Sequence, residues 1–299
     1  MRLLYKLLIY ILCFFFLALV YEDFISTVFG YEGYKWEPNS LKILEAYGLL
    51  IILALLTPNQ IRKPSDFLLH FQLLFPILPM LVLYGFSDKS RAYILLVSLC
   101  FCVVSFLSHY LKPKLLRIPN IDVNFLKNLA FSIGLLYVLV IIALGGLRFL
   151  NFDFTKIYEF RTTSEEALPP IFNRLSPMVA KVFLPFVIIL SLKTRSHLYI
   201  FLSTAICILA FGLTAHRGTI FYPFLVLSFY FLLKHKESLF FLLLGYLSVM
   251  LIVMIAYYLD QKNIIFGSVA LRRTFFVPAN LNFLYYEFFS QNPLDYWAD

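Results

Sequence analysis

The sequence predicts an all-α fold, a polytopic bundle of about nine transmembrane helices. Three observations predict it. Of 299 residues, 61% are hydrophobic and only 14% are charged, whereas soluble domains carry about 25% charged residues. The mean hydropathy is +0.83. Apolar runs of the length that crosses a bilayer, about 20 residues, recur along the chain.

The runs are expected to be helices, because backbone polar groups in lipid must bond within their own segment. They do not alternate as the strands of a β-barrel would. We therefore expect one multi-pass membrane domain over residues 1–299, surrounded by the lipid bilayer. The expected spans, in chain order, are 4–21, 42–57, 67–86, 92–110, 124–147, 177–193, 198–214, 218–233 and 239–259.

Two spans need individual justification. The first run is followed by Tyr21-Glu22-Asp23 and has no small-x-small cleavage site, so we expect a true span and not a signal peptide. Glu45 falls inside the second run. We expect it to act as a hydrogen-bonding partner in the bundle, or to mark a span shorter than 42–57.

The orientation follows from the loops, since short loops rich in Lys and Arg stay in the cytoplasm. With the N-terminus inside, the inner connections carry many cations and only the acids Asp66, Asp122 and Glu237. This N-in arrangement places 21–41, 148–176, 215–218 and 260–299 outside, with 148–176 and 260–299 as the two large outer loops. The inner cations are Arg2, Lys6, Arg62, Lys63, Lys112, Lys114, Arg117, Lys193, Arg195, Lys234 and Lys236.

The last outer segment contains RRTFFVPANLNFLYYEFFSQNPLDYW, from Arg272 to Trp297. Its apolar positions recur at helical spacing, with polar residues on the other side. The pattern predicts a helix lying in the outer membrane interface, apolar face down. The apolar positions are Leu281, Leu284, Tyr285, Phe288 and Phe289, and the polar ones are Asn280, Glu287 and Gln291.

Several function classes are disfavoured. The sequence has no GxxxxGK[ST], HExxH or GxSxG motif, which argues against an ATP-driven pump and a metalloprotease. The four cysteines fall inside spans without metal-ligand spacing, so we expect neither a metal nor a cofactor. Topology explains much of the net charge of +8, and no basic cluster resembles a nucleic-acid footprint, so no nucleic-acid partner is expected.

Arginine on the outer side is the most informative feature. Arg161 lies in NFDFTKIYEFRTTSEEALPPIFNR, Arg217 in LTAHRGTIFYP, and Arg272 and Arg273 in the last segment. The planar guanidinium fork matches two oxygens of a phosphate, so several arginines at one outer cavity would suit a pyrophosphate. The competing interpretation is a simple membrane anchor for Arg217 and lipid binding for Arg272 and Arg273.

Three segments carry a resemblance to a known family. DFTKIYEFR, GLTAHRGTIFYPFLVL and RRTFFVPANLNFLYYEFFSQNPLDYW are similar to parts of the bacterial oligosaccharide repeat-unit polymerases, the O-antigen polymerase (Wzy-type) family. Together they cover about a quarter of the chain. Members of that family are typically longer and have more spans, so we expect this chain to be a truncated member.

The resemblance implies a membrane glycosyltransferase of polysaccharide or lipopolysaccharide biosynthesis in the bacterial inner membrane. Such an enzyme moves a growing glycan from undecaprenyl pyrophosphate onto a new lipid-linked repeat unit at the periplasmic face, and a chain-length regulator protein is a further expected partner. Arg161, Arg217, Arg272 and Arg273 would bind the pyrophosphate. The candidates for the base are Glu159, His216 and Glu287, and those for sugar binding are Tyr158, Asn280, Asn282 and Tyr286.

Two rival functions stay open. An O-antigen ligase or a glycan acyltransferase is also polytopic and can use outer Arg and His residues. A flippase for lipid-linked oligosaccharides would place charged residues within the spans along a path. Here the charges within spans are few, mainly Glu45, Lys127 and Lys181, which favours an enzyme of the outer surface.

Overall fold

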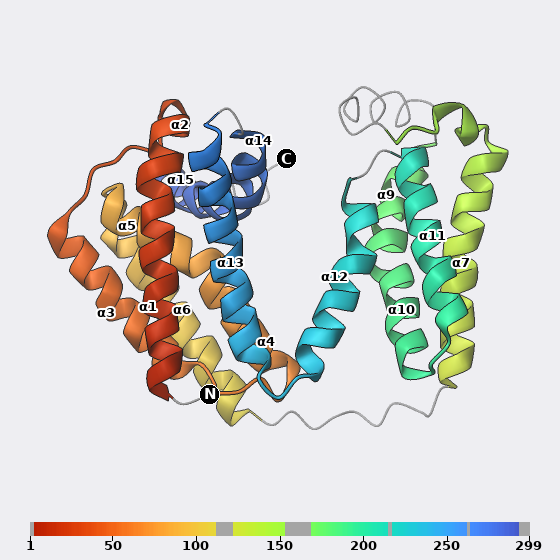
Figure 1. The fold of residues 1–299 in the computed structure, drawn as a ribbon, viewed down its shortest axis with the longest axis horizontal. Coiled ribbons are helices and arrows are strands. Elements are labelled where there is room, and N and C mark those ends of the chain that lie inside the picture. Colours follow the sequence, from red (N-terminus) through yellow and green to blue (C-terminus); the bar gives the residue numbers. More distant parts are fainter. Residues whose placement is uncertain (1–2, 112–121, 153–168, 215–216, 262–263, 293–299) are drawn as a thin grey trace. The chain divides into compact units, whose positions relative to one another are not determined.

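The computed structural model describes residues 3–111, 122–152, 169–214, 217–261 and 264–292 (Figure 1). These residues form helices, and the only β-type pairing among them is one isolated bridge between Glu37 and Ser87. The expected all-α class is therefore confirmed. By its internal contacts the chain divides into two compact units. Unit 1 comprises Met1–Lys114 and Lys236–Asp299, and unit 2 comprises Leu115–His235.

Within the described ranges, seven helices are long and apolar enough to cross a membrane, which supports a multi-pass membrane protein. The two other expected spans are also helices but shorter ones: α3 (Ser40–Leu56) has 17 residues, and the apolar part of α12 (Arg217–Lys234) is Thr219–Lys234. The seven are Leu3–Glu32, Pro64–Phe86, Arg91–Tyr110, Val123–Ala143, Arg174–Lys193, His197–Thr214 and Ser238–Leu259.

Two helix ends differ from the sequence expectation. The first helical stretch continues to Glu32 instead of stopping at residue 21, because Tyr21, Phe24 and Ile25 recur at helical spacing and are buried, although Glu22 and Asp23 lie beside them in the sequence. The fifth span ends at Ala143, not 147. Gly145, with a φ of 86°, adopts a left-handed conformation that ends the helix.

Unit 1 is built around α1. This helix packs against α3, α5 and α13 (Figure 1). Its buried face includes Lys6, Tyr10 and Phe14. Gly85 lets α5 approach α3 closely, because a Cβ there would lie 3.1 Å from Ile43 Cγ1. The elements are α1 (Leu3–Val20), η1 (Tyr21–Ser26), α2 (Thr27–Phe29), η2 (Gly30–Glu32), α3 (Ser40–Leu56), α4 (Pro64–Gln72), η3 (Leu73–Ile77), α5 (Leu78–Phe86), α6 (Arg91–Tyr110), α13 (Ser238–Leu259), α14 (Ile264–Gly267), η6 (Ser268–Phe276) and α15 (Val277–Gln291).

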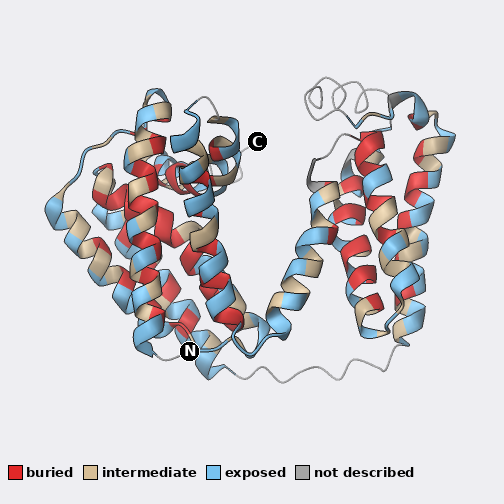
Figure 2. Cartoon of the chain, in the orientation of Figure 1, coloured by how far each residue is buried: buried red, intermediate tan, exposed pale blue. Residues whose placement is uncertain are grey.

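Unit 2 is a smaller bundle in which α10 packs against α7, α11 and α12. Its core includes Val138, Leu184, Cys207 and Leu213, and Gly134 on α7 leaves room for the Leu184 side chain. In both units the helices carry buried residues on one face and exposed apolar residues on another, as lipid contact requires (Figure 2). The elements are α7 (Val123–Ala143), η4 (Gly146–Phe149), α9 (Pro170–Met178), η5 (Val179–Phe183), α10 (Leu184–Lys193), α11 (His197–Thr214) and α12 (Arg217–Lys234).

Wide π-helical turns interrupt several helices, and three of them adjoin prolines. Pro76 lies inside η3, η5 ends two residues before Pro185, and η6 ends two residues before Pro278. Proline lacks the N–H donor of an ordinary turn and its ring crowds the preceding turn, so a wider turn relieves the conflict. π-Helical turns occur frequently at functional sites, and η6 carries Arg272 and Arg273.

Candidate functional site

The described site residues of unit 1 lie on η6 and α15, beyond the end of α13. Packing of aromatic rings fixes η6 at the end of the unit where α1 and its continuation finish. The centroid of the Phe276 ring lies 5.3 Å from that of Tyr21, and the centroid of the Tyr21 ring lies 6.0 Å from that of Trp36. Trp36 in turn stacks on Phe86 at the end of α5, with a centroid distance of 5.0 Å. The elements α1, α5 and η6 therefore meet at one end of unit 1, which the charge pattern assigns to the outside.

Arg272 is held between two residues of the extended first helix. Its Nη1 donates to the Glu32 carboxylate in an ion pair, and its guanidinium carbon lies 4.2 Å from the centroid of the Phe29 ring. The side chain is 12% exposed. Its Nε is buried, and no acceptor for it exists among the described residues. Burial, then the Glu32 charge, raises the pKa of the nearby Tyr34 to about 12, and Arg272 offsets part of this rise.

Arg273, the next residue, is in a different situation. It is exposed, and within the described part of the chain it takes part in no ion pair or hydrogen bond. Its fork is therefore available to two oxygens of an anionic ligand. Of the two neighbouring arginines, Arg272 already has a carboxylate partner and Arg273 does not.

The expected helix is present as α15, and it has two distinct faces; its place in the outer membrane interface stays a prediction. All five predicted apolar positions are exposed on one face, whereas Asn280 and Phe283 are buried against the unit. Tyr286 stacks on Tyr93 of α6 at 4.8 Å, and Phe283 meets Tyr93 edge-on at 5.2 Å. The helical segment also begins earlier than the pattern predicted, at Ile264.

The other residues of the predicted set on α15 differ in exposure. Asn280 is only 7% exposed, and its Oδ1 finds no donor among the described residues. Asn282, Tyr286 and Glu287 are half-buried. Direct contact with a ligand suits these three better than it suits Asn280.

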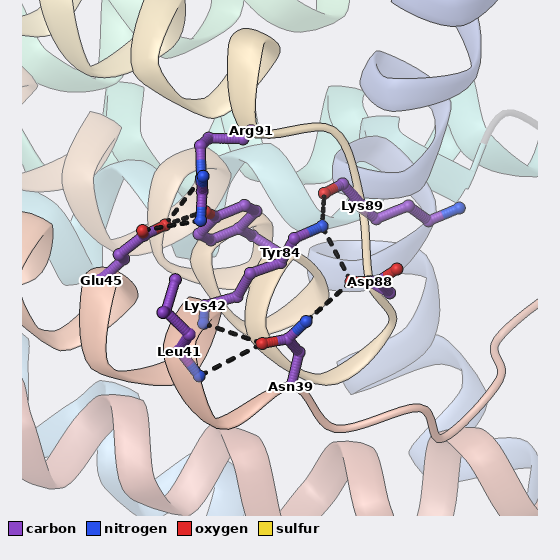
Figure 3. A network of polar contacts seen from close by, with 8 residues as sticks. All are labelled: Asn39, Leu41, Lys42, Glu45, Tyr84, Asp88, Lys89 and Arg91. Atoms are coloured by element: carbon purple, nitrogen blue, oxygen red, sulfur yellow. Dashed lines mark hydrogen bonds and ion pairs between the residues drawn. The ribbon is translucent and has the colours of Figure 1, made fainter.

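A polar network that the sequence did not single out connects the start of α3 with the α5–α6 turn (Figure 3). Arg91 donates from Nη2 and Nε to the two oxygens of Glu45 at 2.8 and 3.1 Å. The Tyr84 hydroxyl also donates to Glu45. Glu45 is therefore a hydrogen-bonding partner, as expected, but with a side chain that is 36% exposed it does not lie in the interior of the bundle. We call this set the Arg91 network: Asn39, Lys42, Glu45, Tyr84, Asp88, Lys89 and Arg91.

The second half of the Arg91 network centres on Lys42. Its ammonium lies 2.9 Å from Asp88 Oδ1 and donates to the Lys89 carbonyl at 2.7 Å. The hydrogen bond from Lys42, together with its charge, lowers the pKa of Asp88. Asn39 caps α3 by accepting from the N–H of Leu41 and Lys42, both at 3.2 Å. The network thus fixes the N-terminus of α3 beside the first turn of α6.

Five of the predicted site residues cannot be located relative to η6 and α15. Tyr158, Glu159, Arg161 and His216 lie outside the described residues. Arg217 is the first residue of α12, and its side chain is not described. All five belong to unit 2, whereas Arg272, Arg273 and the α15 residues belong to unit 1.

Among the described residues, no hydrogen bond or ion pair joins one predicted site residue to another; Arg272 and Tyr286 pair instead with Glu32 and Tyr93. Sequence reasoning missed these partners. The available signal for the Arg91 network was the short charged turn between the third and fourth spans, Asp88-Lys89-Ser90-Arg91, which the orientation places outside.

The arrangement at this end of unit 1 offers a guanidinium without a carboxylate partner, an aromatic pair and polar side chains of α15. This combination can bind an anionic group and stack on a ring. Comparison of the chain with protein-family models, curated proteins and solved structures found no match.

Proposed function

We propose that the chain is a bacterial polysaccharide repeat-unit polymerase, a membrane glycosyltransferase acting at the outer face of the inner membrane. It would transfer a growing glycan from undecaprenyl pyrophosphate to a new lipid-linked repeat unit. The three sequence segments that resemble the O-antigen polymerase family and the multi-pass helical fold support this proposal.

One structural observation carries the proposal furthest. The exposed Arg273 adjoins Arg272, and Arg272 already binds a carboxylate. A lipid pyrophosphate carries several negative charges, and it becomes the leaving group when the glycosidic bond breaks. Arg273 would hold its oxygens first, and the pyrophosphate would then compete with Glu32 for Arg272. Guanidinium groups fixed in a partly dry site stabilise the charge that develops on the leaving group.

The remaining roles follow from the reaction. A base must take the proton of the acceptor hydroxyl. Glu287 is the candidate that the structure describes, at the half-buried side of α15, and Glu159 and His216 remain proposed alternatives. Tyr286, already stacked on Tyr93, and Asn282 are the proposed contacts for the acceptor sugars. The donor is activated by its pyrophosphate, so the proposed reaction requires no nucleotide.

The test is deletion of the gene in its host, followed by gel analysis of the surface polysaccharide. Loss of polymerase activity leaves single repeat units on the anchor. Loss of every repeat unit would instead indicate a flippase or a ligase, and an unchanged ladder with altered acylation would indicate an acyltransferase. Either result would overturn the proposal.

The family resemblance also implies Arg161 and Arg217 as pyrophosphate-binding residues, independently of the residues on η6. Replacing Arg161 or Arg217 by Ala is expected to abolish long chains while the protein remains in the membrane at its normal level. Normal chain length in both variants would remove these two residues from the proposed mechanism and leave the test by gene deletion standing.

A further inference from the structure

A polar cavity lies at the other end of unit 1, where α3 and α6 end and α4 begins. Its volume is about 780 Å³. We call it the Arg62 cavity. Its lining residues are Leu55, Leu56, Thr57, Pro58, Asn59, Gln60, Arg62, Lys63, Asp66 and His109. The orientation predicted from the loop charges places this end in the cytoplasm.

Gln60 orients the Arg62 side chain but accepts only part of its N–H groups. Its Nε and Nη2 donate to Oε1 of Gln60 at 3.1 and 2.8 Å. A guanidinium has about five N–H donors, so more than half of them remain, and no other acceptor for them is found among the described residues. Lys63 Nζ donates to the Ser108 carbonyl at 2.8 Å, which holds a second cation beside the end of α6.

Asp66 is the one acid in the cavity lining, and other groups already use its carboxylate. Oδ2 accepts the backbone N–H groups of Arg62 and Lys63 at 3.0 and 3.1 Å. Its side chain is 7% exposed, and its ion pair with Lys63 has a distance of 4.0 Å. In the cavity lining, the two cations Arg62 and Lys63 therefore outnumber one largely buried carboxylate.

Buried side chains form hydrogen bonds to the backbone of Thr57 and Pro58, which line the cavity. The fully buried Lys6 donates to the Thr57 carbonyl at 2.6 Å, and the buried His70 lies between Pro58 O at 2.9 Å and the Tyr10 hydroxyl at 2.7 Å. No carboxylate among the described residues pairs with Lys6. Its charge therefore adds to the positive potential behind the wall, and the rigid loop limits the ordering cost of binding.

We infer that the Arg62 cavity binds a phosphate group, either the headgroup of an anionic lipid or a free phosphate ester. The guanidinium fork fits phosphate oxygens better than it fits halides or single-point acceptors. Leu55 and Leu56 provide an apolar border on α3, one of the spans expected from the sequence. Basic pockets between transmembrane helices on the cytoplasmic side commonly bind lipid head groups.

The test uses the full-length protein in phosphatidylcholine nanodiscs, with and without phosphatidylglycerol, and measures bound phosphatidylglycerol by native mass spectrometry. The double variant Arg62→Gln, Lys63→Gln is expected to bind about 30-fold more weakly, because each cation near an anionic headgroup contributes about 1 kcal/mol and 1.4 kcal/mol is tenfold. The matched control is Lys193→Gln, Arg195→Gln, which removes two exposed cations from another inner loop and is expected to bind as the parent protein does.

A second arm separates the two sources of phosphate. Inorganic phosphate that displaces phosphatidylglycerol, or that binds in pure phosphatidylcholine nanodiscs, assigns a free phosphate ester; binding of the lipid alone assigns the headgroup. Arg62→Lys keeps the charge and loses the fork, so it is expected to bind several-fold more weakly even if the double variant fails to fold. Parental affinity in Arg62→Lys or in the double variant, or an equal loss in the control, overturns the inference.

Discussion

The cations at the two ends of unit 1 have mostly different partners. At the end with η6, Arg272, Arg91 and Lys42 are paired with the carboxylates Glu32, Glu45 and Asp88. At the other end, Lys6 and Arg62 bond to a carbonyl and an amide oxygen, and Lys63 approaches the Asp66 carboxylate only to 4.0 Å. Lys6 and Glu32 belong to one helical stretch and are separated by roughly 40 Å at 1.5 Å per residue.

The presence or absence of a carboxylate partner distinguishes cations that stabilise the fold from cations that remain available to a ligand. A cation that already has a carboxylate partner can bind an anion only by exchanging that partner. Arg273 and Arg62 have no carboxylate partner among the described residues. We therefore place the proposed pyrophosphate contact first on Arg273 and the inferred phosphate contact on Arg62. Four predictions test this division, from the largest effect to the smallest.

Breaking the most buried pair should have the largest effect. Glu32→Gln leaves the guanidinium of Arg272, whose side chain is 12% exposed, without its carboxylate. Because an uncompensated buried charge is costly, we expect a loss of about 3 kcal/mol in unfolding free energy. The measurement is denaturant unfolding in detergent. Adding Arg272→Gln should restore part of the stability, and an unchanged midpoint for Glu32→Gln would contradict the assigned role.

At the other end, the length of the Lys6 side chain should matter more than its charge. Lys6→Ala removes buried atoms and leaves the Thr57 carbonyl without its donor, so we expect a loss of about 2 kcal/mol. Lys6→Met keeps most of the packing and removes a buried charge that no carboxylate neutralises, so its loss should be smaller. The same unfolding assay compares the two variants. An equal loss in both would show that the ammonium itself holds this end.

The Lys42–Asp88 pair should make stability depend on acid pH. The folded pKa of Asp88 is lowered, first by the hydrogen bond from Lys42 and then by its charge. The contribution of the pair is therefore present above the unfolded pKa of 3.8 and is lost as the pH falls through the lower folded value. The thermal midpoints of the parent and Asp88→Asn should differ at neutral pH and converge in acid. A difference that persists in acid would assign the effect to backbone conformation.

The smallest effect is expected from the Arg91–Glu45 pair. The two side chains are 51% and 36% exposed, so solvent screens their attraction. A double-mutant cycle with Arg91→Gln and Glu45→Gln should give a coupling free energy close to zero that falls further in high salt. A larger coupling that does not depend on salt would mean that the membrane environment shields the Arg91 network from water.

The sequence predicted most helices because their apolar runs are long, and it predicted the two faces of α15 because the spacing of Leu281, Leu284 and Phe288 is helical. It missed the continuation of the first helix to Glu32. Local composition near Glu22 and Asp23 suggests a loop, whereas tertiary packing of Phe24 decides the structure. Propensity is a weak guide where buried contacts compete with it.

The partners of the site residues could not be predicted. Glu32 and Arg272 are separated by 240 positions and Glu45 and Arg91 by 46. No periodicity connects residues on different helices, so the distinction between the paired Arg272 and the exposed Arg273 required the packing of α2 and η6 against each other. From the sequence alone the two arginines were equivalent candidates.

The most direct test of the account is the length distribution of surface polysaccharide in a strain that carries Arg273→Gln, compared with Arg148→Gln. Arg148 is a second exposed cation on the predicted outer side, and we assign it no ligand. The account predicts short chains for Arg273→Gln and a full ladder for Arg148→Gln, with both proteins present at normal levels. A full ladder in Arg273→Gln would contradict the proposed site.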